Sequence, residues 1–125
     1  MIEDGNGETI LIVDDSPSMR EMIRFTLKSA GYRVIAATDG VEAMQYANQN
    51  PVNLVVTDIN MPNMDGITLI QELRKLDSYK FTPILTLTTE GGDDLKQDGK
   101  DAGATGWIVK PFDPDSLLKV IKRVL

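Results

Sequence analysis

Short apolar runs alternate along the chain with longer segments in which apolar residues recur every three or four positions. The runs are rich in β-branched side chains and show no polar alternation, which is typical of strands buried on both faces of a parallel sheet. They cover residues 10–13, 34–37, 54–57, 84–87 and 107–109. Because these strands alternate strictly with helical segments, the pattern predicts an α/β fold, a doubly wound five-stranded parallel sheet with helices on both faces.

The intervening segments carry signals for the ends of helices. Ser16 followed by Pro17 predicts the start of the first helix, and Gly31 predicts its end. Asp39 with Glu42 three residues later is close to a capping box and predicts the start of the second helix. Further helices are expected around residues 67–73, 93–102 and 114–125, the last one capped by Asp113.

The expected helix over residues 93–102 has the weakest signal. Leu95 is its only large apolar side chain, and Gly99 interrupts it. A helix with so little apolar surface to bury is held loosely. We therefore expect this helix to be the most easily displaced, and the glycine-rich, acidic segment Glu90–Asp94 before it to be poorly ordered.

Length and charge bound the class of protein. The chain has 125 residues, with 13 basic and 19 acidic side chains and a net charge of −6. We expect a flexible acidic tail over residues 1–8 and one domain over residues 9–125. The acidity argues against a nucleic-acid partner, and no apolar run approaches the ~18–20 residues of a membrane span. The sequence thus predicts a soluble, cytoplasmic single domain, and we expect it to be a monomer.

The missing residue types restrict the chemistry. The chain has no cysteine and no histidine. This excludes disulfides, thiolate nucleophiles, imidazole bases and the Ser-His-Asp triad. Any bound metal must then be a hard cation held by oxygen atoms.

Polar residues with complementary chemistry follow four of the expected strands. Asp14 and Asp15 follow the first strand, Asp58 the third, Thr88 the fourth and Lys110 the fifth. Ligands of open α/β sheets bind at the carboxyl edge of the strands, where these side chains would meet. Three carboxylates there repel one another, and Mg²⁺ would remove that conflict. A lysine and a hydroxyl could bind phosphoryl oxygens, so the set predicts phosphoryl chemistry with a carboxylate acceptor.

Each residue alone has an ordinary interpretation. Asp14 or Asp15 could cap the first helix, Asp58 could begin a turn, Thr88 could be a plain strand residue, and Lys110 could be a solvated lysine. The convergence of four strand ends on one complementary set favours a site.

Four motifs stand at the ends of the expected strands and in the loops that follow them. They are Ile12-Val13-Asp14-Asp15-Ser16, Asp58-Ile59-Asn60-Met61-Pro62-Asn63-Met64-Asp65-Gly66, Thr88-Thr89-Glu90 and Ala102-Gly103-Ala104-Thr105-Gly106-Trp107-Ile108-Val109-Lys110-Pro111-Phe112. Together they resemble the receiver domain of two-component response regulators, and within that family the stand-alone chemotaxis regulators of the CheY type. The resemblance covers residues 9–125.

The resemblance implies a fold and a role for each site residue. It implies a flavodoxin-like, CheY-like three-layer sandwich with strand order 2-1-3-4-5 and a cis Lys110–Pro111 bond. It implies that Asp58 is the phosphoacceptor and that Thr88 and Lys110 contact the phosphoryl group. The implied ligands of Mg²⁺ are Asp14, Asp15, Asp58 and the backbone carbonyl of Asn60.

The resemblance also implies a switch and partners. Thr88 and Trp107 would change position on phosphorylation, with Trp107 standing where the family commonly has tyrosine or phenylalanine. The surface formed by residues 93–102, 107–109 and 114–125 would then bind a target. The donor would be a histidine kinase such as CheA and the target a flagellar switch protein such as FliM. The protein would be a signalling phosphoacceptor and not an enzyme in the usual sense.

Three alternatives stay open at this point. The first is a stand-alone receiver in a phosphorelay outside chemotaxis. The second is a Mg²⁺-dependent phosphohydrolase with an aspartate nucleophile, although such enzymes resemble an Asp-x-Asp pattern and Asp14 and Asp15 are adjacent. The third is a nucleotide- or flavin-binding domain, which the absence of a glycine-rich phosphate loop after any strand disfavours.

Overall fold

The computed structural model describes residues 7–89 and 93–125 of the chain. Its strands are β1 (Thr9–Val13), β2 (Arg33–Ala37), β3 (Leu54–Asp58), β4 (Ile84–Thr88) and β5 (Gly106–Val109). Its helices are α1 (Pro17–Ser29), α2 (Gly40–Gln49), α3 (Gly66–Lys75), α4 (Asp93–Ala102) and α5 (Pro114–Val124), with a short 3₁₀ helix η1 (Asp77–Tyr79) after α3. The predicted alternation of strands and helices is confirmed.

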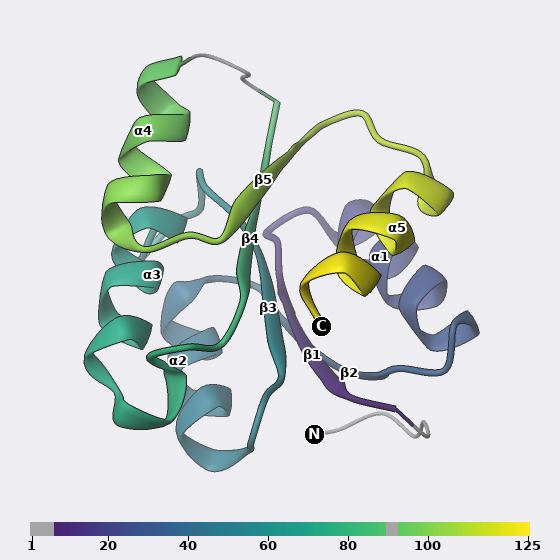
Figure 1. Cartoon of the computed structure of the whole chain (residues 1–125), viewed down its shortest axis with the longest axis horizontal. Coiled ribbons are helices and arrows are strands. Elements are labelled where there is room, and N and C mark those ends of the chain that lie inside the picture. Colours follow the sequence, from purple (N-terminus) through teal and green to yellow (C-terminus); the bar gives the residue numbers. More distant parts are fainter. Residues whose placement is uncertain (1–6, 90–92) are drawn as a thin grey trace.

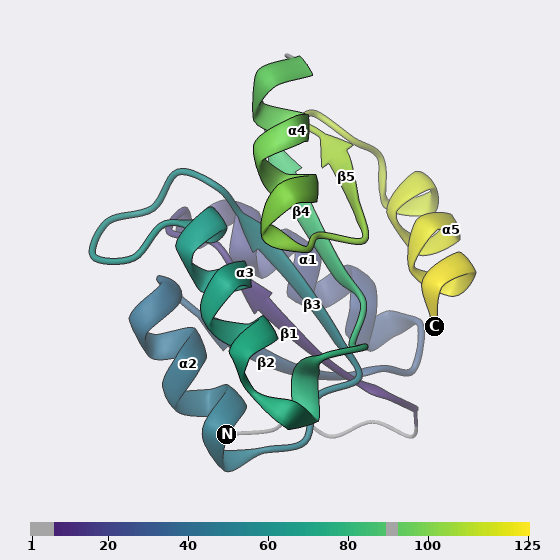
Figure 2. The same ribbon diagram turned by 60° about the vertical axis from the view of Figure 1, so that its left-hand side comes forward.

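The strands form one parallel sheet in the order β2-β1-β3-β4-β5. Helices α1 and α5 cover one face, and α2, α3 and α4 cover the other (Figures 1 and 2). Val13 pairs with Thr57 and with Ala37, so β1 lies between β2 and β3. This order confirms the doubly wound fold and puts the carboxyl ends of β1 and β3 next to each other.

The core consists of two layers because successive side chains of a strand point to opposite faces. Leu11 and Val13 of β1 pack with α2 and α3, whereas Ile10 and Ile12 pack with α1 and α5. All four side chains are fully buried. Both faces of β1 are therefore apolar, which explains the uninterrupted hydrophobic run in the sequence.

Side chains cap the helices where the sequence predicted caps. The Ser16 hydroxyl accepts a hydrogen bond from the Met19 amide, and the carboxylates of Asp39 and Asp113 accept from Glu42 and Ser116. Asp65 caps α3 in the same way, although the sequence analysis named no cap for that helix. Gly31, with φ of 94°, follows the end of α1 in the left-handed conformation that glycine adopts without strain.

Two sequence predictions concern segments at the limits of the described residues. Helix α4 spans Asp93–Ala102, as predicted. Residues 90–92 of the Glu90–Asp94 segment and residues 1–6 of the predicted acidic tail lie outside the described residues. Gly7 and Glu8, the last two residues of the predicted tail, form hydrogen bonds with the domain. The Gly7 amide donates to the Gly31 carbonyl, and the Glu8 carbonyl accepts from the Arg33 amide. Within residues 7–89 and 93–125, no helix is long and apolar enough to cross a membrane.

Candidate functional site

Three aspartates meet at the carboxyl edge of the sheet. Asp14 directly follows β1 and Asp58 is the last residue of β3, and these two strands are neighbours. Asp14 is buried, Asp15 is exposed and Asp58 is partly buried, and one carboxylate oxygen from each lies within 4.8 Å of the others. The strand order thus brings together three carboxylates that the sequence separates by 44 positions, from Asp14 to Asp58.

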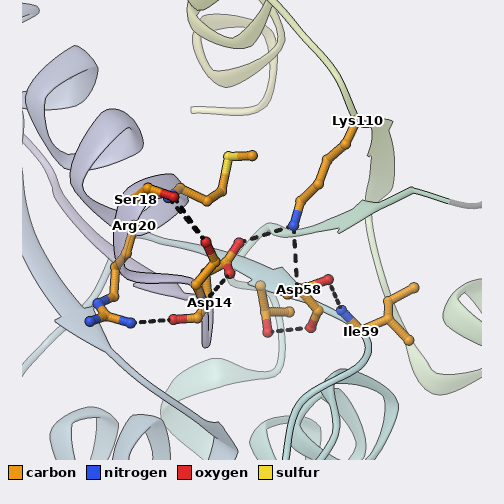
Figure 3. Close-up of polar contacts among 9 residues, drawn as sticks. Asp14, Ser18, Arg20, Asp58, Ile59 and Lys110 are labelled. Carbon is orange, nitrogen blue, oxygen red and sulfur yellow. Dashed lines mark hydrogen bonds and ion pairs between the residues drawn. The ribbon is translucent and has the colours of Figure 1, made fainter.

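Lys110 reaches this cluster from the carboxyl end of β5, the outermost strand beside β4. Its ammonium nitrogen lies 3.1 Å from Asp14 Oδ2 and 3.4 Å from Asp58 Oδ2, between the two carboxylates (Figure 3). The Lys110 amide donates to the Thr88 carbonyl at the end of β4, and the following bond to Pro111 is cis. The hydrogen bond to Thr88 holds the backbone from which the lysine extends. Lys110 is therefore not a freely solvated lysine.

The backbone and side chain of Asp14 are held from three sides. Its Oδ1 accepts a hydrogen bond from the Ser16 amide at 2.8 Å, and its own amide donates to the Ala37 carbonyl. The guanidinium of Arg20 donates to the Asp14 carbonyl at 2.7 Å (Figure 3). The cap of α1 is Ser16, so Asp14 does not serve as that cap. Sequence reasoning assigned no role to Arg20, because nothing in its spacing points to a backbone carbonyl.

The environment of Asp58 shifts its proton affinity. Burial is the largest effect and raises the pKa of Asp58 above its ordinary value. The Lys110 ammonium lowers this pKa, and the Asp14 carboxylate raises it. Asp58 Oδ1 also accepts a hydrogen bond from the Ile59 amide at 2.8 Å. One carboxylate oxygen is thereby anchored to the backbone, while the other faces Lys110.

The donor set fits a hard divalent cation. It consists of carboxylate oxygens at different depths, with Asp15 open to solvent. Mg²⁺ prefers oxygen ligands and keeps several of its waters, so a half-open acidic pocket suits it. Asn60, whose carbonyl the sequence prediction adds to the ligands, is exposed on the loop between β3 and α3.

That loop folds back sharply behind Asp58. The Gly66 amide donates to the Ile59 carbonyl at 2.7 Å. A Cβ atom added at Gly66 would lie 2.1 Å from the Asp58 carbonyl oxygen, so only glycine fits at this position. The close approach keeps the start of α3 against the end of β3.

The two predicted switch residues lie on neighbouring strands. Thr88 is buried at the end of β4, whereas Trp107 on β5 is 42% exposed. The Lys96 ammonium of α4 lies over the Trp107 ring, 5.1 Å from its centre. Lys96, Gln97, Lys100 and Trp107 line a shallow cavity of about 310 Å³. Sequence reasoning had not connected Lys96 with Trp107.

Comparison with known proteins shows the family to which the chain is similar. Residues 10–122 match the family described as the response regulator receiver domain. Chemotaxis protein CheY1 of Helicobacter pylori is 40% identical over 118 residues, covering 93% of this chain and 95% of that protein. The master transcriptional regulator RpaA of Synechocystis is 35% identical over 116 residues, which span 93% of this chain and 48% of that protein.

Solved structures agree with this match. Chemotaxis response regulator CheY4 of Vibrio cholerae has a TM-score of 0.92 and 48% identity, covering 96% of this chain and all of that one. The receiver domain of the sensor histidine kinase PA1611 of Pseudomonas aeruginosa, solved with a magnesium ion in its active-site cleft, has a TM-score of 0.88 and 29% identity, covering 94% and 97%.

The chain therefore belongs to the response regulator receiver domain family. It is a CheY-like receiver. Such domains are signalling phosphoacceptors that bind Mg²⁺ at an acidic pocket, here the cluster of Asp14, Asp15 and Asp58. A receiver of this kind implies a histidine kinase as donor and a downstream target.

Proposed function

We propose that Asp58 accepts a phosphoryl group from a phosphohistidine of a partner kinase. The observation that carries this proposal is the position of the Lys110 ammonium, within 3.4 Å of Asp58 and 3.1 Å of Asp14. This arrangement places a candidate nucleophile, Asp58, beside both an acidic pocket that could hold a metal ion and the positive charge of Lys110. Because these 125 residues contain no histidine, the donor imidazole lies outside this chain.

In the proposed transfer, a carboxylate oxygen of Asp58 attacks phosphorus and forms a P–O bond. The P–N bond to the donor imidazole breaks, its electron pair stays on that nitrogen, and the imidazole takes a proton from solvent. Lys110 neutralises charge on the phosphoryl oxygens, and the Ile59 amide keeps the carboxylate oriented. Asp14, Asp15, Asp58 and the Asn60 carbonyl would hold Mg²⁺, which when bound supplies positive charge to the same oxygens.

The signal leaves the site through Thr88 and Trp107. New phosphoryl oxygens would draw the Thr88 hydroxyl toward Asp58 and open space for the Trp107 ring. Trp107 is 42% exposed, so an inward rotation would change the surface of α4, β5 and α5. That surface is the one we propose as the binding site for the target. The protein would catalyse only its own phosphorylation and dephosphorylation.

The pathway we propose is chemotaxis. The support is that relatives at 40% identity are named chemotaxis proteins. The donor would then be a CheA-like kinase and the target a flagellar switch protein such as FliM, with a monomeric receiver acting between them in the cytoplasm. A phosphorylation-dependent pull-down of such partners tests this step. Equal recovery with the phosphorylated and unphosphorylated forms would count against it.

Phosphorylation itself is tested by incubating the protein with acetyl phosphate and Mg²⁺ and measuring intact mass. We expect one added phosphoryl group in the parent and none in Asp58→Asn. Asp77→Asn is the matched control, because Asp77 is an exposed carboxylate of η1 that belongs to no part of the site. Labelling of Asp58→Asn at the parent level would refute the proposed acceptor.

A further inference from the structure

The loop that carries Asn60 is hydrogen-bonded to the N-terminus of α2. The Asn63 side-chain amide donates to Asp39 Oδ2 at 2.7 Å, and the Gly40 amide donates to the Met64 carbonyl at 3.2 Å. In Figure 2 the loop after β3 lies beside one end of α2. Two bonds thus connect the segment on which the metal site depends to a different element of the fold.

Asp39 serves two structures at once. Its Oδ1 accepts from the Glu42 amide at 2.9 Å and caps α2, while its Oδ2 accepts from Asn63. These hydrogen bonds hold the pKa of Asp39 below its ordinary value, so the carboxylate is ionised at neutral pH and remains an acceptor. Capping α2 needs only one of its two oxygens. The second oxygen is therefore available for a different role.

Asn63 occupies a conformation that defines the loop. Its φ of 68° lies in the left-handed region. Among residues 7–89 and 93–125, Asn63 is the only residue other than glycine that has a positive φ. Asparagine tolerates this region, but its side chain also supplies the donor for Asp39. The Met64 amide donates a hydrogen bond of 2.7 Å to the Pro62 carbonyl, which closes the turn around Asn63. The direction of the backbone between Asp58 and Asn63 depends on this turn.

We propose that the Asp39–Asn63 hydrogen bond is a positioning contact for the Mg²⁺ site, fixing the loop so that the Asn60 carbonyl faces the carboxylates. This inference rests on the proposed metal ligands. Residues that orient metal ligands without touching the metal change affinity by roughly 10–100-fold when altered. For one carbonyl among several ligands we expect the lower end of that range, about tenfold.

Four variants separate this role from helix capping and from net charge. Asp39→Ser retains a capping oxygen for α2 but cannot reach Asn63. Asn63→Gly retains the positive φ and the charge of Asp39 but removes the donor. The double variant D39N/N63D exchanges donor and acceptor, which restores the bond at unchanged net charge. Asp113→Ser is the matched control, because Asp113 caps α5 in the same way as Asp39 caps α2.

The readout is the Mg²⁺ dissociation constant from isothermal titration calorimetry, with urea unfolding in EDTA to show that each variant is folded. We expect weaker binding by about tenfold in Asp39→Ser and Asn63→Gly, parent-like binding in D39N/N63D, and no change in Asp113→Ser. A merely structural role would lower unfolding stability and leave the dissociation constant of the folded protein unchanged, which would overturn the proposal.

Other outcomes are equally decisive. If Asp39→Ser weakens binding but Asn63→Gly does not, the effect is the loss of charge and the proposal is wrong. If the parent itself shows no Mg²⁺ binding, the proposed metal ligands fail and this inference fails with them. Parent binding combined with unaffected variants would overturn only the positioning role.

Discussion

Replacing Arg74 by methionine removes a guanidinium that joins three parts of the fold. Arg74 lies at the end of α3 and donates to the Gly103 carbonyl after α4 at 2.8 and 3.0 Å. It also donates to the carbonyls of Tyr79 and Thr82, at 2.6 and 2.7 Å, in the segment that leads into β4. A longer bond of 3.3 Å reaches the Lys80 carbonyl. Methionine retains most of the aliphatic stem and loses every one of these donors.

The expected cost follows from the carbonyls that lose their donor. A hydrogen bond to a charged group contributes roughly 1.5–3 kcal/mol, and an orphaned buried acceptor costs about 1–3 kcal/mol. Gly103 and Thr82 are only partly buried, so water can replace part of what they lose. Burial also lowers the pKa of Arg74, which shows that the guanidinium itself is partly desolvated in the folded state. Together these effects predict a loss of about 2–4 kcal/mol in the free energy of unfolding.

The assay is urea unfolding followed by circular dichroism and by Trp107 fluorescence. The matched control is Arg24→Met, since Arg24 makes an ion pair with Glu21 at 2.7 Å on the surface of α1. Exposed pairs of this kind contribute ~0–1 kcal/mol. Arg74→Lys keeps the charge without the planar fork and should fall between parent and Arg74→Met. An Arg74→Met variant no less stable than Arg24→Met would refute the reasoning.

Three further predictions use the same unfolding measurement. Gly66→Ala places a Cβ 2.1 Å from the Asp58 carbonyl oxygen and should cost roughly 3 kcal/mol; a loss below about 1 kcal/mol would show that the loop shifts easily. Tyr79→Phe removes a hydroxyl that donates to the carbonyls of Ala47 and Asn50, at 2.7 and 2.8 Å, and should cost about 1–3 kcal/mol, whereas parent stability would contradict it. Asp39 has a lowered pKa, chiefly from the Glu42 amide and then from Asn63, so its contribution is present above the unfolded pKa and is lost as pH falls through the folded one. Asp39→Asn should therefore show a smaller loss of stability below about pH 4 than the parent, and identical acid profiles would refute this.

The alternation of strands and helices was predictable because it depends on local signals. Because each strand is buried on both faces, its sequence is a continuous apolar run. Helix starts are indicated by residues whose side-chain oxygens can cap them, namely Ser16, Asp39 and Asp113. The role of Arg74 was not predictable in this way. In the sequence it is one of two basic residues in the last turn of α3, where either would suit the helix dipole. Only the folded chain brings the Gly103 carbonyl within its reach.

The meeting of Asp14, Asp58 and Lys110 was predictable for a different reason. Parallel strands end at a common edge, so residues that follow different strands converge however far apart they are in sequence. The contacts of Arg20 with the Asp14 carbonyl and of Asn63 with Asp39 do not follow from that rule. They depend on the paths of loops and on the rotation of helices, which hydrophobic periodicity leaves undetermined.

The charge state of Asp58 shows where sequence reasoning ends. A phosphoacceptor must be ionised to attack phosphorus, and the sequence indicates which charges surround it. The direction in which the pKa of Asp58 shifts depends on how deeply the carboxylate is buried. Burial raises this pKa more strongly than any single neighbouring charge shifts it. Lys110 opposes this effect only because its ammonium lies between the two carboxylates and not in solvent. In the transfer that we propose, Lys110 would therefore act before any phosphoryl group arrives, because it favours the ionised form of Asp58.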